Sequence, residues 1–219
     1  IGSHTDNRMA GTWGDLGAFS FFPTKNLGGY GDAGLVTTQS DELAQEAKLL
    51  RVHGAKQRYF HDSVGGNFRI DALQAGLLST RFKHLGTGGD GRKRWAEQYN
   101  QAFASHGLTQ AGPSQLRLPA EVMGTHVYNQ YTLLAASEAH RSHVLEELAN
   151  ANIGHSIYYP VPLHLQACFS DLGYKTGDFP VTEAAAKTVF SIPVFPQLSQ
   201  DEHTYVVETI VRACETFKG

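Results

Sequence analysis

A lysine that follows an aromatic run and a proline is the most reactive candidate in this sequence. The run Ala18–Phe22 holds three phenylalanines, and Lys25 comes two residues after Pro23. Burial beside such rings lowers the pKa of an amine and frees its lone pair to attack a carbonyl. Ser20 offers a hydroxyl to a phosphate oxygen. These residue types fit imine chemistry beside a phosphate, although composition alone favours an exposed lysine in a Gly-rich hairpin.

The elements that position Lys25 are expected to be a strand and its return. The apolar run predicts a buried strand, the glycines of residues 28–34 predict a turn, and Leu35–Thr38 predicts the returning strand. Ser40 is a good N-cap for a helix that ends near Gly54. Ala55–Gly66 has neither the helical nor the strand period and predicts a long ordered loop, a kind of segment that is often functional.

A group of glycines separates two helical patterns in the middle of the chain. Asp71–Leu85 and Arg92–His106 are both predicted helices, and we expect the glycines of residues 86–91 to interrupt the helix between them. We therefore divide the chain into residues 1–88, a part of a large domain that carries Lys25, and residues 89–219, a smaller C-terminal domain.

The second half alternates strand and helix patterns and predicts an α/β fold. Val127–Leu134 and the extended, proline-containing segment Ser191–Pro196 are the predicted strand-like segments. Glu138–Asn150, Thr182–Val189 and Ser199–Lys218 are the predicted helices.

Composition excludes several classes of function. The chain of 219 residues is 41% hydrophobic and 18% charged, which is ordinary for a globular protein. Its formal net charge of -3 and its lack of a dense basic run argue against nucleic acid as a partner. The sequence has no apolar stretch long enough for a membrane helix and no signal-peptide pattern, so we expect a cytoplasmic protein. His140 and His143 are the only closely spaced histidines on a predicted helix, and we expect no metal site.

Two blocks of residues together resemble one enzyme family. Residues 14–34 match G-D-x-x-x-F-S-F-x-x-x-K-x-L-x-x-x-G-D-x-G at every fixed position. A second block starts at Arg51-Val52-His53-Gly54 and continues through Gly65 to Ala75, with the pattern N-x-R-x-x-x-x-Q-A. Both are similar to motifs of the DegT/StrS sugar aminotransferases, in which the lysine of the first motif carries pyridoxal 5'-phosphate (PLP) as a Schiff base.

The resemblance implies a fold, a cofactor and a reaction. The fold would be the C-terminal portion of the fold type I PLP-dependent transferases, with residues 1–88 as the later part of the PLP-binding domain. Lys25 would hold PLP and move the proton, Ser20 would bind its phosphate, and Asn67 would reach the phosphate of the other subunit in a homodimer. The amino group would pass from glutamate to a nucleotide-linked keto sugar, for an amino sugar of a polysaccharide or a glycosylated metabolite.

A third block implies contacts with the substrate. The segment Tyr158-Tyr159-Pro160-Val161-Pro162-Leu163-His164 resembles the C-terminal signature of the family, in which Tyr159 and His164 would lie near the sugar. Arg69 of the second block is the other candidate for substrate binding. The structural alternatives are a satisfied structural histidine at position 164, and helix capping or a surface ion pair for Asn67 and Arg69.

Two further interpretations stay open. Aminotransferases that act on cyclitols or on amino-hydroxybenzoates share the motifs around Lys25, and a non-catalytic binding or regulatory relative would retain the same fold. Family members also carry an aspartate for the pyridine nitrogen, in a part of the chain that would precede Ile1. We therefore interpret the sequence as the later part of an enzyme whose complete site needs further residues.

Overall fold

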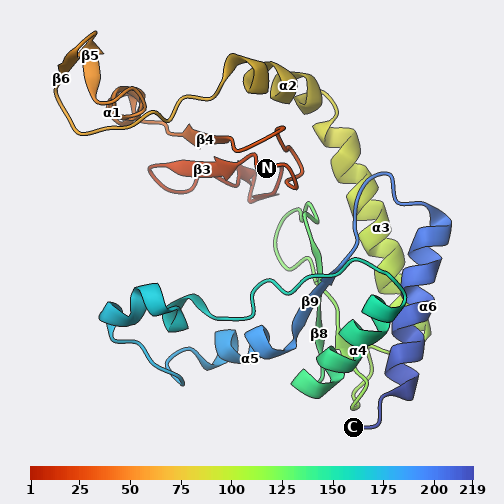
Figure 1. Cartoon of the computed structure of the whole chain (residues 1–219). Helices are drawn as coiled ribbons and strands as arrows, with labels where there is room; N and C mark the ends of the chain where they lie inside the picture. Colours follow the sequence, from red (N-terminus) through yellow and green to blue (C-terminus); the bar gives the residue numbers. More distant parts are fainter. The chain divides into compact units, whose positions relative to one another are not determined.

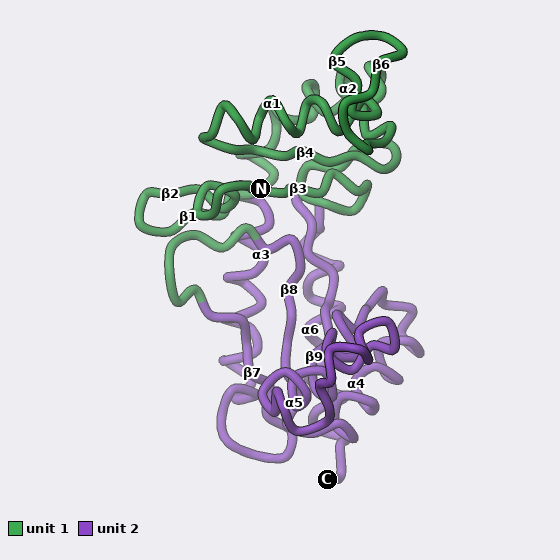
Figure 2. Tube along the Cα trace, turned by 90° about the vertical axis from the view of Figure 1, so that its left-hand side faces the viewer, with its two compact units in different colours: residues 1–90, 121–127 green, residues 91–120, 128–219 purple.

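The computed structural model describes residues 1–219, which form two compact units. Unit 1 consists of Ile1–Asp90 and Glu121–Val127, and unit 2 of Gly91–Ala120 and Tyr128–Gly219 (Figure 2). Both units contain helices and strands, as an α/β chain should. The assignment of residues 1–88 to a cofactor domain and of residues 89–219 to a small domain stays a prediction.

Unit 1 is built from short antiparallel strand pairs and helices (Figure 1). Its pairs are β1 (His4–Thr5) with β2 (Arg8–Met9), β3 (Gly17–Ser20) with β4 (Gly34–Thr37), and β5 (Ala55–Gln57) with β6 (Phe60–His61). Its complete helices are α1 (Asp41–Leu50) and α2 (Ala72–Phe82). A small core of Phe21, Leu27 and Leu78 joins the segment after β3 to α2.

Two expectations about unit 1 need correction. β3 is shorter than the predicted strand and ends at Ser20, and only Gly17 in it is buried. No residue of β4 is buried either, so the side chains of the two-stranded β3–β4 sheet are largely exposed. The segment Ala55–Gly66 is not irregular throughout, because β5 and β6 form a hairpin within it.

Unit 2 is a three-stranded antiparallel sheet with helices packed beside it. The strand order is β7 (Leu116–Arg117), β8 (Tyr131–Ala135) and β9 (Val189–Ile192). The helices α4 (Glu138–Asn150) and α6 (Gln200–Thr216) lie beside each other next to this sheet (Figure 1). The remaining elements are η1 (Leu163–Leu165), η2 (Ala167–Leu172), α5 (Pro180–Thr188) and the part of α3 (Leu85–Ser105) that starts at Gly91. None of the helices in the chain combines the length and apolarity needed to cross a membrane.

Local sequence signals determine where the helices of unit 2 begin. Ser137 accepts a hydrogen bond from the backbone N–H of His140 at the start of α4. Ser199 and Glu202 form a reciprocal capping box at the start of α6. The predicted helices over Glu138–Asn150 and Ser199–Lys218 are confirmed, the second with slightly shorter bounds.

The predicted interruption at the glycines of residues 86–91 is wrong. α3 (Leu85–Ser105) runs through them without a break, and the turn comes earlier, at Lys83 and His84 after α2. Glycine in a helix interior costs only about 0.5–1 kcal/mol relative to alanine, and the buried second half of α3 offsets this cost. At Gly91 a glycine is favourable, because a Cβ there would lie 3.1 Å from Pro196.

A histidine in the core of unit 2 should make stability depend on pH. His140 is fully buried, its Nδ1 accepts a hydrogen bond from the N–H of Ala136 at 3.3 Å, and its Nε2 lies 3.4 Å from Sγ of Cys214. Burial lowers the pKa of His140, and His143 lowers it further. An unfolded chain therefore binds a proton below about pH 6.5 that the folded chain excludes.

We predict that the free energy of unfolding falls as pH drops below about 6.5 and is constant above it, so far as His140 is concerned. Urea unfolding followed by circular dichroism between pH 5 and 8 measures this slope. His140→Leu should reduce the slope by about one proton. Equal slopes in the wild type and His140→Leu would refute the assignment.

Candidate active site

Lys25 lies in a tight turn that hydrogen bonds hold onto the end of β3. The N–H of Lys25 donates to the carbonyl oxygen of Phe22 at 2.9 Å, and the N–H of Gly29 donates to that of Phe21 at 2.7 Å. Phe21 N–H also donates to Ala33 at 2.8 Å, which extends the pairing of β3 and β4 by one residue. The lysine is half-buried. We expected Lys25 at the end of a buried strand, and this is wrong. The strand β3 already ends at Ser20, and of the two phenylalanines that follow it Phe21 is buried while Phe22 is exposed.

Glycines allow the turn after Lys25 to close. A Cβ at Gly28 would lie 2.3 Å from the carbonyl oxygen of Pro23, a distance that no side chain tolerates. A Cβ at Gly34 would lie 2.9 Å from the carbonyl oxygen of Phe19 in the facing strand. Any larger residue at these two positions would force the backbone apart and displace Lys25.

Two polar side chains next to this turn have hydrogen-bonding capacity left. Ser20 is exposed, and its Oγ accepts from the N–H of Phe22 at 3.2 Å, so its own hydrogen is free to donate. Asn26 donates from Nδ2 to the carbonyl oxygen of Val127 at 3.0 Å, while its buried Oδ1 has no partner. Sequence reasoning missed Asn26, and its only signal was its place beside Lys25.

Asn67 and Arg69 lie on a segment that the backbone holds in place. The N–H of His53 donates to Gly66 at 2.9 Å, and the N–H of Phe68 donates to Arg51 at 3.0 Å, on either side of Asn67. Both side chains are exposed and neither forms an ion pair or a hydrogen bond within the chain. Asp71, not Asn67 or Arg69, is the N-cap of α2. The geometry therefore gives no support to capping or ion pairing as their role.

His164 belongs to a hydrogen-bonded network within unit 2. Its side chain is 8% exposed, and its Nε2 lies 3.0 Å from Oε1 of Glu183 on α5. The Glu183 carboxylate also accepts from the N–H groups of Gly177, at 2.9 Å, and Phe179, at 3.3 Å. The Gly177 bond, then the bonds from His164 and Phe179, lower the pKa of Glu183 against the opposing effect of burial. This network favours a structural role for His164, and substrate contact by it stays a prediction.

Tyr159 is 69% exposed, on the loop before η1. Its contact with a sugar substrate also stays a prediction. The structure gives two groups of candidates: Ser20 at the end of β3 with Lys25 in the turn that follows, and His164 with Glu183 in one network. Asn67 and Arg69 share a third segment, and their side chains form no hydrogen bond or ion pair with Ser20 or Lys25.

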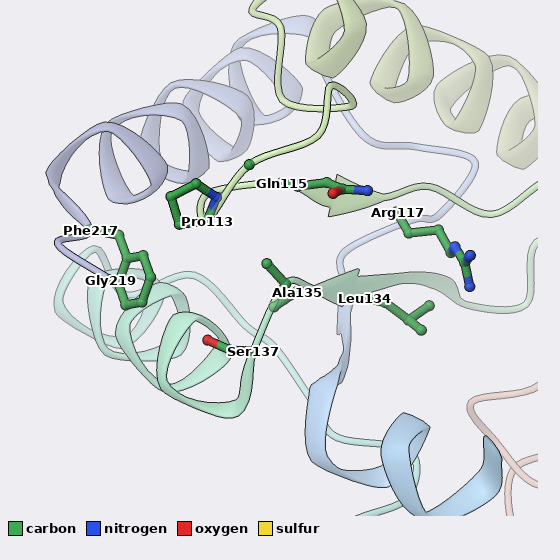
Figure 3. Close-up of a pocket in the computed structure, with 10 residues that line it drawn as sticks. Pro113, Gln115, Arg117, Leu134, Ala135, Ser137, Phe217 and Gly219 are labelled. Carbon is green, nitrogen blue, oxygen red and sulfur yellow. The ribbon is translucent and has the colours of Figure 1, made fainter. Parts of the chain in front are cut away.

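The cavity of about 490 Å³ in unit 2 contains none of these residues (Figure 3). The cavity is lined by residues in or next to β7 and β8 and by the C-terminal end of the chain. They include Gln115, Arg117, Ser137 and Phe217. Ser137 already caps α4 there. No group of three or more His, Cys, Asp or Glu side chains in the chain is arranged to hold a metal ion.

Known proteins share this architecture. The structure of S. venezuelae DesV, solved in complex with a ketimine intermediate, matches with a TM-score of 0.87 and 30% identity over 99% of this chain and 56% of that one. A DegT DnrJ EryC1 StrS aminotransferase from Brucella abortus matches with a TM-score of 0.83 and 29% identity over 96% of this chain and 54% of that one. The fold is therefore that of the C-terminal portion of the PLP-dependent sugar aminotransferases.

The chain belongs to the DegT/DnrJ/EryC1/StrS aminotransferase family, whose model matches residues 1–211. A "Pleiotropic regulatory protein" of Geobacillus stearothermophilus is 42% identical over 96% of this chain and 55% of its own length. A UDP-N-acetyl-3-dehydro-alpha-D-glucosamine 3-aminotransferase of Acidithiobacillus ferrooxidans is 39% identical over 97% of this chain and 54% of its own. The chain thus spans about half the length of the curated relatives it matches.

Proposed function

We propose that this chain is the Lys25-carrying part of a PLP-dependent aminotransferase that moves an amino group from glutamate to a nucleotide-linked keto sugar. One observation carries the proposal: Lys25 lies in a glycine-closed turn that follows β3, and the last residue of β3, Ser20, has a hydroxyl that is free to donate. Relatives that are named for nucleotide-linked sugars support the substrate class. The proposal places the reaction in the cytoplasm, in the synthesis of amino sugars.

The residues of the turn fit PLP. The backbone folds back tightly after Lys25, because a Cβ at Gly28 would lie 2.3 Å from the carbonyl oxygen of Pro23. Ser20 Oγ has a hydrogen to donate to a phosphate oxygen. When bound, PLP supplies an electron sink that stabilises negative charge on the substrate carbon.

The chain's own residues divide the work between holding and proton transfer. Nζ of Lys25 would hold the cofactor covalently and, once released by the amino donor, accept and return the proton. Ser20 would fix the phosphate, together with Asn67 of the partner subunit in a homodimer. The unbonded, exposed side chain of Asn67 is available for that role. Tyr159, Arg69 and His164 would contact the substrate.

Amino transfer from glutamate to a panel of nucleotide-linked keto sugars tests this function. We expect turnover with at least one member of the panel and none with cyclitol ketones. Turnover confined to cyclitol or amino-hydroxybenzoate precursors would replace the substrate class and keep Lys25 in its role.

A regulatory, non-catalytic role is the second candidate, because a relative that is 42% identical is named as a regulatory protein. A binding-only protein would carry no cofactor on the peptide that contains Lys25. Borohydride reduction, which fixes an imine as a stable amine, followed by peptide mass mapping separates the two candidates.

Asn67→Ala should weaken PLP retention roughly 10- to 100-fold, the effect of losing one hydrogen bond to a charged group. Equilibrium dialysis against PLP measures it, and Asn150→Ala, at an exposed asparagine of α4, is the matched control.

Mixing Lys25→Ala subunits with Asn67→Ala subunits tests whether the site is shared across the dimer. If Asn67 serves the other subunit, each mixed dimer has one intact site and activity returns; if both residues act within one subunit, it does not.

A further inference from the structure

One face of α2 packs against the turn that carries Lys25 and forms hydrogen bonds with it. Gln74, Leu78 and Arg81 follow one another at spacings of four and three, so their side chains project from the same side of the helix. Leu78 is buried in the small core of unit 1 with Phe21 and Leu27, which flank the lysine in sequence. This apolar contact places α2 against the turn.

Two hydrogen bonds lie on either side of that apolar contact. Oε1 of Gln74 accepts from the backbone N–H of Tyr30 at 2.8 Å, and Nη1 of Arg81 donates to the carbonyl oxygen of Gly28 at 2.7 Å. Both bonds therefore fix backbone atoms of the segment that follows Lys25. The residues that form these bonds with the segment lie 44 and 53 positions away in the sequence, so the bonds depend on the packing of α2 against the turn.

The glycines of the turn make room for Gln74. A Cβ at Gly29 would lie 3.1 Å from Oε1 of Gln74, and one at Gly31 would lie 2.7 Å from its Nε2. The amide of Gln74 thus lies directly over the backbone of this segment. An alanine at Gly31 would push the amide away and loosen the bond to Tyr30.

We propose that Gln74 and Arg81 are positioning residues, which hold the segment Gly28–Tyr30 so that the amine of Lys25 stays where it reacts with the cofactor aldehyde. The inference rests on the proposed function for its chemistry and on the two hydrogen bonds for its geometry. Neither side chain needs to touch the cofactor, because each acts on the backbone that follows Lys25.

Two measurements on the intact protein test the inference. Hydrogen–deuterium exchange follows the backbone N–H groups of residues 28–31, and the growth of Schiff-base absorbance after PLP is added follows the linkage to Lys25. We expect Gln74→Ala to speed exchange at Tyr30 and to slow the linkage, each roughly 3- to 10-fold, the effect of one hydrogen bond. Gln74→Glu keeps an acceptor oxygen and should restore both. Thr80→Ala, an exposed neighbour on α2 whose hydroxyl bonds only to Gly76, should change neither.

A variant of Arg81 keeps the test decisive if Gln74→Ala does not fold. Arg81→Met removes the donor to Gly28 and should reproduce the two effects, while Arg81→Lys keeps a donor and should rescue them. Unchanged exchange or an unchanged linkage rate in Gln74→Ala and Arg81→Met, with normal linkage in the wild type, overturns the positioning role alone. A wild-type protein that forms no Schiff base overturns the proposed function as well.

Discussion

We expect Lys25→Ala to abolish the proposed amino transfer and to leave the fold intact. The loss should be at least ~10²–10⁴-fold, the range that a positioned acid–base group contributes, before the loss of covalent holding is counted. The fold should survive because the Lys25 side chain is half-buried and forms no hydrogen bond or ion pair within the chain, while its backbone N–H still donates to Phe22. Glutamate-dependent turnover measures the activity, and circular dichroism measures the fold.

Two further lysine variants make this prediction specific. Lys48→Ala, at an exposed lysine of α1, should retain full turnover. Lys25→Arg keeps the positive charge but cannot form an imine at neutral pH, so it should be as inactive as Lys25→Ala. Normal turnover by either Lys25 variant would end the proposal.

Phe190→Ala lowers the free energy of unfolding of unit 2 by about 3–5 kcal/mol, the usual cost of truncating a buried phenylalanine. Phe190 is 0% exposed in β9, where it pairs with Leu133 of β8 in the centre of the core. A loss of this size is a large part of the ~5–15 kcal/mol that typical domains have. Trp95 is buried in the same core, so its fluorescence during urea unfolding reports on unit 2 when Trp13 is replaced by phenylalanine.

Phe169→Ala is the matched control for the core prediction. Phe169 lies on η2 and is 41% exposed, so its truncation should cost no more than about 0.5–1 kcal/mol. Equal losses in the two variants would show that the β8–β9 pair does not form the core described for unit 2.

Local signals made parts of the structure predictable. The helix α4 was predicted with its bounds, because its apolar residues recur at helical spacing. The return of the chain from β3 to β4 was predictable because glycines mark the turn between two short apolar runs. The family was predictable from the motif around Lys25, and the match over residues 1–211 confirms it.

Contacts between distant residues were not predictable. The continuity of α3 through its glycines depends on packing of its second half, through residues such as Tyr99 and Phe103, which no local pattern at Gly86–Gly91 shows. The hydrogen bond from Tyr30 to Gln74 joins residues 44 apart in sequence. The motif therefore predicts that a glutamine is present but not that it binds the backbone after Lys25. The hydrogen bond between His164 and Glu183 was likewise not predictable, because the fold must first bring α5 close to His164.

Borohydride reduction of the PLP-treated protein, followed by peptide mass mapping, tests most directly whether the amine of Lys25 bonds to the cofactor. The expected result is one peptide, the one that contains Lys25, heavier by the mass of the reduced cofactor. A cofactor mass on any other lysine, or on none, would contradict the proposed site.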